Sequence, residues 1–260
     1  NWIIKHENRP LTSYCIIQNF GADITIEADL STLSVKKNSV CFLNPGSYIS
    51  SIEVTDDDHY FVEFNSAFYC LELHDKEISC NGLLFGATPV IPLLKYTEEQ
   101  AQENFNILKM MLKEFEHNDN TQGDMLRLLL KRLIIICVRI GRSRLFNDSN
   151  PLEDETDLIR KFQALVEVHF REKHKVADYA DMLFKSPKTL SNTFNKLGSA
   201  GPLQIIQERI VLEAKRQIHY TDKTIKEITY ELGFSEPPQF SRLFKNITGK
   251  SPSEFQLSLV

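Results

Sequence analysis

The sequence predicts an α+β protein with two domains: an N-terminal small β-barrel followed by a helix hairpin, and a C-terminal all-α domain with two helix-turn-helix modules. Three observations support this prediction. Short apolar runs alternate with turn residues in the first third of the chain, helical periodicity begins after Pro92, and the last hundred residues contain an internal repeat. With 42% hydrophobic and 25% charged residues, the composition excludes a disordered tail and a collagen-like repeat.

The predicted β-barrel begins at Tyr14 and extends to about Leu94. Apolar runs recur there every 8 to 12 residues or so, a spacing typical of antiparallel strands in a sandwich or barrel. We interpret these runs as strands of a small barrel. They are Tyr14–Ile17, Ile24–Ile26, Leu33–Val35, Val40–Leu43 and Tyr60–Phe64.

Two helices, 97–117 and 122–141, are predicted after the barrel because apolar residues recur there at three- and four-residue steps. A short polar stretch joins them, which favours an antiparallel hairpin. The apolar arc of the second helix is wider than packing against one neighbour requires. The surplus surface predicts either a homodimer through these two helices or packing of the hairpin on the chain's own barrel.

A polar, turn-rich stretch, Phe146 to Asp157, predicts the domain boundary and divides the chain into 1–148 and 149–260. The net charge of −5 taken alone argues against a nucleic-acid partner. The charge is unevenly distributed, however, because residues 1–150 hold 14 basic and 20 acidic side chains and residues 160–260 hold 16 basic and 11 acidic ones. This asymmetry indicates two domains with different partners.

The C-terminal domain contains an approximate repeat, in which residues 176–198 correspond to 225–249 at an offset of 49 to 51 residues. Each copy predicts a short helix, a tight turn, and a second helix opened by Ser and Pro. An amphipathic helix over 202–218 would hold the two modules apart, and Arg209 on it is interpreted as a structural or phosphate-facing residue. Second helices that enter successive major grooves of one duplex face lie about 34 Å apart.

The second helix of each copy has one apolar and one polar face. Leu190 and Phe194, matched by Phe240 and Phe244, lie four residues apart and are expected to face the core. The outward side chains suit base edges and phosphates, because Arg pairs with guanine, Asn or Gln with adenine, and Lys neutralises phosphate. The alternative is a merely solvated helix face. The candidate DNA-binding residues are Lys188, Ser191, Asn192, Asn195, Gln239, Ser241, Arg242 and Lys245.

The last hundred residues resemble the DNA-binding domain of the AraC/XylS family of bacterial transcription regulators. The N-terminal part is similar to the cupin-type barrel and helix hairpin that many members place before it, through Phe42 to Gly46. The chain departs from the family pattern at Thr229, Phe184 and Pro237-Pro238. The segments that carry the resemblance are Arg209-Ile210, Ala214-Lys215, Ile225, Ile228, Leu232-Gly233-Phe234, Phe240 to Lys245 and Thr248 to Pro252.

This resemblance implies a cytoplasmic, sequence-specific regulator of transcription, of the activator kind, that binds double-stranded DNA. It also implies a cupin-like N-terminal domain that binds a small-molecule effector and dimerises, with RNA polymerase as a further candidate partner. No residue of an effector pocket is predicted. A rival interpretation makes the barrel a scaffold for dimerisation or for a partner protein, without an effector.

No catalytic residue, cofactor or metal site is predicted. A nucleophile elbow, a P-loop, a GxGxxG turn and a His-x-His pair are all missing from the sequence. Cys70, His74 and Cys80 could suit a soft metal, but structural zinc takes four ligands at closer spacing, so we interpret them as ordinary residues. Five widely spaced cysteines favour a reducing cytosol, and no apolar run reaches the 20 residues or so that a bilayer requires.

Overall fold

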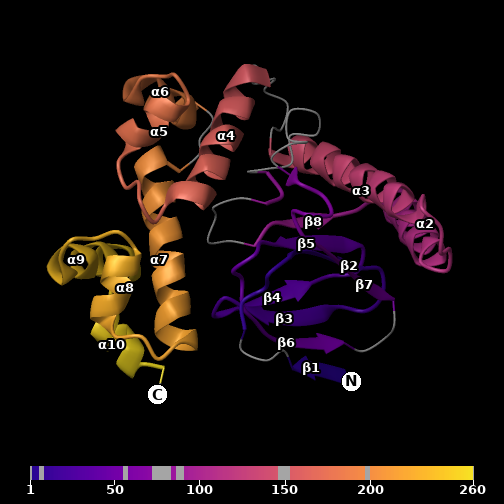
Figure 1. Cartoon of the computed structure of the whole chain (residues 1–260), viewed down its shortest axis with the longest axis horizontal. Coiled ribbons are helices and arrows are strands. Elements are labelled where there is room, and N and C mark those ends of the chain that lie inside the picture. The colour runs from indigo at the N-terminus through magenta and orange to yellow at the C-terminus, as the bar shows by residue number, and fades with distance from the viewer. Residues whose placement is uncertain are drawn as a thin grey trace. The chain divides into compact units, whose positions relative to one another are not determined.

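The computed structural model describes residues 2–5, 9–54, 58–71, 83–85, 91–145, 153–196 and 200–259. The described residues form two compact units, one ending with helix α3 and the other running from helix α4 to the C-terminal end (Figure 1). None of the described helices is both long and apolar enough to cross a membrane.

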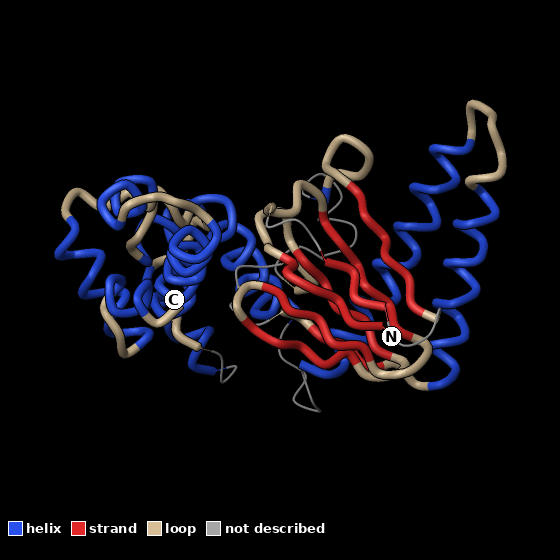
Figure 2. The backbone as a smooth tube through the Cα atoms, turned by 90° about the horizontal axis from the view of Figure 1, so that it is seen from below, coloured by secondary structure: helices blue, strands red, loops and turns tan. Residues whose placement is uncertain are grey.

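The N-terminal unit contains two antiparallel four-stranded sheets (Figure 2), with strand orders β1-β6-β3-β4 and β7-β2-β5-β8. The predictions for β2, β3, β4, β5 and β7 are confirmed, whereas β1, β6 and β8 were not predicted. The strands are β1 (Trp2–Lys5), β2 (Tyr14–Asn19), β3 (Ile24–Ala28), β4 (Ser31–Val35), β5 (Ser39–Leu43), β6 (Ile49–Val54), β7 (His59–Phe64) and β8 (Leu93–Lys95).

The predicted barrel is not closed in the described part of the chain, because no described strand of one sheet pairs with a strand of the other. Strands β2 and β5 lie in the middle of a sheet that is covered on both faces. Ile17 and Cys41 pack between the two sheets, while Ile16 and Val40 pack in the core that includes the helices. A layered arrangement therefore buries both faces of this sheet without a closed ring of strands.

Two long helices, α2 (Glu98–Glu114) and α3 (Gln122–Leu145), form the predicted hairpin. A capping box starts α2, in which the Thr97 hydroxyl accepts the Gln100 N–H at 3.2 Å and the Gln100 side chain accepts the Thr97 N–H at 3.0 Å. The hairpin shares a core with the β7-β2-β5-β8 sheet, so it packs on the chain's own strands. Apolar side chains that remain exposed on it are Met110, Leu112, Phe115, Met125 and Leu128.

The C-terminal unit is all helical and has one shared core. Helix α7 has 19 residues and is therefore about 28 Å long. Figure 1 shows α5 and α6 near one end of α7 and α8 and α9 near the other. The helices are α4 (Glu153–His169), α5 (Val176–Met182), α6 (Pro187–Lys196), α7 (Pro202–Tyr220), α8 (Ile225–Glu231), α9 (Pro237–Thr248) and α10 (Pro252–Leu257).

Candidate nucleic-acid interface

Helices α6 and α9 are the second helices of the two predicted modules, which we call the first module (α5 and α6) and the second module (α8 and α9). Leu190 and Phe194 on α6, and Phe240 and Phe244 on α9, are all fully buried. The predicted inner face is therefore confirmed in both modules. Burial of two residues four apart fixes which side of each helix points outward.

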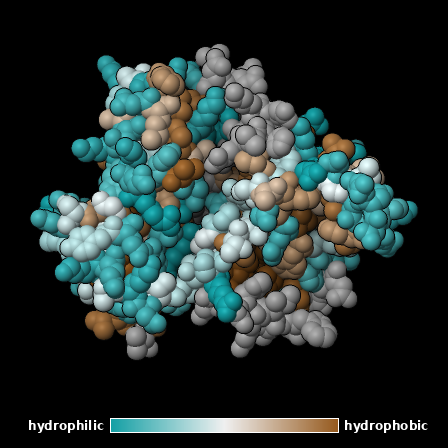
Figure 3. Space-filling model, viewed as in Figure 1, coloured by the Kyte–Doolittle hydropathy of each residue, from teal (hydrophilic) through white to brown (hydrophobic). Residues whose placement is uncertain are grey.

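The predicted DNA-binding residues occupy the opposite side of α6 and α9. Ser191 and Ser241 are partly buried, and the other six side chains are exposed. The Ser191 hydroxyl donates to the Pro187 carbonyl at 3.0 Å, which leaves its oxygen as an acceptor. Asn192 and Arg242 have no hydrogen bond or ion pair with any described residue. Their polar groups are therefore available to an external partner, and the surface over α9 in Figure 3 is mostly hydrophilic.

The two outward helices begin differently. In α6 the Ser186 hydroxyl accepts the backbone N–H of Thr189 at 3.0 Å, which satisfies one N–H of the first turn. Helix α9 begins with Pro237 and Pro238, neither of which has a backbone N–H, and the Glu236 side chain makes no cap. The side chains that α9 can offer as donors therefore begin at its third residue, Gln239.

A buried cluster of charged side chains joins α4 to α7. The Arg209 guanidinium donates to both Glu167 carboxylate oxygens at 2.8 Å and to Glu213 at 3.3 Å, and lies 3.9 Å from the ring centroid of Phe170. Only 4% of Arg209 is exposed. The structural interpretation of Arg209 is confirmed, and a role in touching phosphate is excluded by its burial.

Glu213 is the carboxylate that the cluster shares. Burial raises its pKa, but the surrounding guanidinium groups of Arg209, Arg171 and Arg216 outweigh burial and hold the pKa below its ordinary value. Arg171 donates to Glu213 at 2.7 Å from the segment that follows α4. The cluster therefore fixes the end of α4 against the middle of α7, the helix on which all four helices of the two modules pack.

A family comparison identifies this helical unit. Residues 179–258 match the model of a family described as "Helix-turn-helix domain". The C-terminal helices form an AraC-type DNA-binding domain. The matched range covers most of α5 and all of α6 to α10, so it includes the second module whole and the first module except for the start of α5.

Curated proteins are similar to part of this chain. The chain is 31% identical over 110 residues to the bifunctional transcriptional activator/DNA repair enzyme AdaA of Bacillus subtilis (strain 168). This match covers 42% of this chain and 51% of AdaA. It is 23% identical over 148 residues to an HTH-type transcriptional regulator of Staphylococcus aureus (strain MSSA476), covering 57% of this chain and 20% of that protein. The chain thus spans about half the length of AdaA and a fifth of the staphylococcal regulator.

Two solved structures are also similar. ToxT from Vibrio cholerae O395 is 18% identical with a TM-score of 0.44, and the match covers 97% of this chain and 92% of ToxT. The DNA-binding domain of AdpA, solved in complex with a target DNA, is 25% identical with a TM-score of 0.34, and the match covers 42% of this chain and 93% of that domain.

The cysteine and histidine grouping of the sequence falls largely outside the described residues. Cys70 is described and partly buried, whereas His74 and Cys80 lie outside. Across the described ranges, no three His, Cys, Asp or Glu side chains are grouped as a metal site would require. Burial raises the pKa of the Cys41 and Cys137 thiols to about 12, so both stay protonated and unreactive at neutral pH.

The N-terminal unit contains a cavity that sequence reasoning missed. It has a volume of about 510 Å³ and lies between β7 and the α2–α3 hairpin. Its lining comes from four segments that are far apart in the sequence, which a local pattern cannot bring together. The available signal was the alternation of Tyr60, Val62 and Phe64 on one face of β7, opposite the apolar positions Leu108 and Leu112 of α2.

Proposed function

We propose that this protein is a sequence-specific DNA-binding regulator of transcription that engages one duplex with both modules of its AraC-type domain. The observation that carries the proposal is the pair of outward faces on α6 and α9, where Asn192 and Arg242 are exposed and unpaired among the described residues. Arg and Asn are side chains that pair bidentately with guanine and adenine. The excess of basic over acidic residues in 160–260 favours the same partner.

The domain arrangement belongs to this proposal. Residues 149–260 form the DNA-binding domain, and residues 1–148 form a cupin-like domain that senses a small effector and makes a homodimer through helices 97–117 and 122–141. The exposed apolar side chains of the hairpin, such as Met125 and Leu128, support the homodimer. The name of AdaA includes an activator role, which we extend to this chain, with RNA polymerase as partner and the cytoplasm as location.

Selection of bound DNA from a random pool tests the proposal. The expected outcome is an enriched pair of short motifs whose centres lie about 10 base pairs apart, one for each module. A pool that yields no motif, with affinity that depends only on salt, contradicts sequence-specific recognition. The control is a double variant, Asn192→Ala with Arg242→Ala, which is expected to lose the motifs while remaining folded, because both side chains are exposed.

The second candidate function is a DNA-binding regulator whose N-terminal unit is only an assembly scaffold. The exposed apolar surface of the hairpin supports this scaffold function as well as it supports the sensor, since a dimer needs no effector. Thermal unfolding across a metabolite panel separates the two. A sensor gains RT ln(1 + [L]/Kd), which is about 2.7 kcal/mol at a hundredfold excess over Kd, and a scaffold gains nothing.

A further inference from the structure

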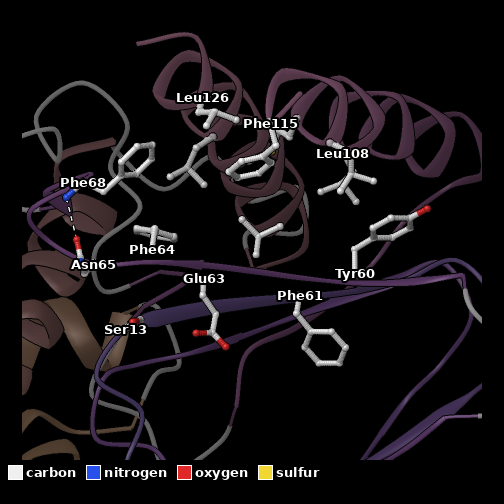
Figure 4. Close-up of a pocket in the computed structure, with 14 residues that line it drawn as sticks. Ser13, Tyr60, Phe61, Glu63, Phe64, Asn65, Phe68, Leu108, Phe115 and Leu126 are labelled. Carbon is white, nitrogen blue, oxygen red and sulfur yellow. Dashed lines mark hydrogen bonds between the residues drawn. The ribbon is translucent and has the colours of Figure 1, made fainter. Parts of the chain in front are cut away.

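The cavity of the N-terminal unit has walls from a strand, two helices and a loop (Figure 4). Tyr60 and Phe64 project from β7 toward the hairpin, while Leu108 of α2 and Leu126 of α3 face them across the cavity. Phe68 closes one end. A volume of about 510 Å³ lies within the range of small-molecule sites, roughly 300–1,000 Å³.

The cavity has a buried floor and an open mouth. Leu130, Leu108 and Phe64 on the floor are 1%, 2% and 5% exposed, whereas Leu112 and Phe115 at the mouth are 53% and 65% exposed. Hydrophobic atoms gather between the hairpin and the strands on the face shown in Figure 3. The concavity therefore reaches the core, and a small molecule can occupy it more completely than the convex surface of another protein can.

The lining selects an uncharged ligand. None of the described lining residues is a cation, and the single carboxylate, Glu63, projects from the opposite face of β7 (Figure 4). A charged group buried here would lose its hydration without gaining a counter-charge. Asn65 lies at one end, where its side-chain oxygen accepts the Phe68 N–H at 2.9 Å, which leaves its amide N–H groups as possible donors for a neutral acceptor.

We propose that this cavity binds one uncharged, largely aromatic small molecule, and that this molecule is the effector of the regulator. The second half of this statement rests on the proposed function. Because β7, α2 and α3 all contribute to the lining, the bound molecule would stabilise the hairpin on the sheet. Leu112 and Phe115 belong both to the mouth and to the exposed apolar surface of the hairpin, so occupancy changes the surface offered to a second subunit.

The test uses the full chain and a matched pair of fluorescent probes, N-phenyl-1-naphthylamine and its 8-sulfonate. They share the same aromatic skeleton and differ by one negative charge. We expect saturable binding of the uncharged probe at one site per chain, tighter than the sulfonate by about tenfold or more. Equal or tighter binding of the sulfonate overturns the assignment of an uncharged ligand.

Two variants locate the binding site. Leu112→Trp fills the mouth from an exposed position and is expected to weaken the uncharged probe by about tenfold, while the matched control Met110→Trp, on the same helix but outside the lining, leaves it unchanged. Phe115→Arg adds a cation at the mouth and is expected to shift the preference toward the sulfonate. Wild-type binding in both mouth variants overturns the proposal.

The same samples separate failure of this inference from failure of the proposed function. DNA binding is measured on each protein, and sequence-specific DNA binding without probe binding overturns the cavity assignment alone. Absence of sequence-specific DNA binding overturns the proposed function, whatever the probe does. A stoichiometry of one probe per two chains, removed equally by Met110→Trp, assigns the site to an interface between copies and contradicts a ligand cavity within one chain.

Discussion

The two helix-turn-helix modules share a plan but differ at the turn. Phe184 in the first module and Gly233 in the second both adopt left-handed backbone conformations, with φ of +53° and +78°. Phe184 is 94% exposed, whereas a Cβ on Gly233 would lie 2.0 Å from the Arg171 carbonyl oxygen. The turn geometry thus repeats, but the second turn packs against the segment after α4 and the first projects into solvent.

The second module has an additional attachment at this place. Phe234, directly after Gly233, stacks on the His174 ring with centroids 4.5 Å apart. Lys185, in the equivalent position of the first module, is exposed and makes no such contact. A repeated sequence therefore encodes the local helix-turn-helix, while contacts with the segment that follows α4 restrict the residue at the second turn. The difference predicts that the two modules respond unequally to substitution.

The largest effect is expected from the feature that both modules share. Arg209→Ala removes the buried guanidinium and leaves Glu167 and Glu213 without it, and we expect a loss of about 3–5 kcal/mol of unfolding free energy. Denaturant titration measures this loss. The control is Lys226→Ala, an exposed position on α8, which is expected to change stability by less than about 0.5 kcal/mol. A similar small change for Arg209→Ala contradicts a supporting role for the cluster.

Gly233→Ala is expected to have the next largest effect, because the added methyl meets a backbone oxygen and because L-residues are strained at positive φ. We expect a loss of about 2–4 kcal/mol. Phe184→Ala is the matched substitution in the first module, and its expected change is within about 1 kcal/mol, since that turn lies in solvent. Equal losses for the two variants show that the turns are not differently packed.

DNA affinity sharpens the comparison on the outward faces. Arg242→Ala and Asn192→Ala are each expected to weaken binding to the selected site by about 1–3 kcal/mol and to relax preference at one base pair in the matching half-site. Fluorescence anisotropy against single-base variants measures this. An unchanged preference with a shallower salt dependence shows instead that the side chain contacts phosphate. A loss confined to one of the two variants assigns recognition to that module alone.

The smallest expected effect is a pH dependence from His174, the residue between α4 and α5 on which Phe234 of the second module's turn stacks. Burial lowers the pKa of the His174 imidazole below its ordinary value, so the unfolded chain takes up a proton more readily than the folded one. Stability is then fully present above the unfolded pKa, about 6.5, and falls as the pH is lowered through it, by at most about 1.4 kcal/mol per pH unit. His174→Phe keeps the stack and is expected to lack this part of the slope, as measured by unfolding at pH 7 and pH 5.

Local patterns predicted the elements that function depends on. The positions of α6 and α9, and the burial of their two apolar residues, followed from the repeat and from helical periodicity. The hairpin helices also followed from periodicity, with ends within a few residues of those observed. These features are encoded by residues close together in the sequence, so local sequence patterns were enough to predict them.

Features built from distant segments could not be predicted in the same way. The predicted closed barrel was wrong because a series of apolar runs does not show whether the first and last strands of the series pair. The continuous apolar run from Val40 to Leu43 does indicate a strand that is covered on both faces. The spacing of four residues on one helix could have indicated Glu213 as a partner of Arg209, although it was not predicted, whereas Glu167 lies 42 residues before Arg209 and no local pattern indicates it. The cavity lies between β7 and the hairpin, so it could not be predicted without knowing how these elements pack together.

The central claim is that both modules bind one duplex at the same time, and changing the spacing of the selected site tests it most directly. Insertion of about five base pairs between the half-sites rotates them by half a helical turn and places the second half-site on the opposite face of the DNA. We predict that affinity for this site falls to that for a single half-site. Affinity equal to that of the original site contradicts simultaneous binding by α6 and α9.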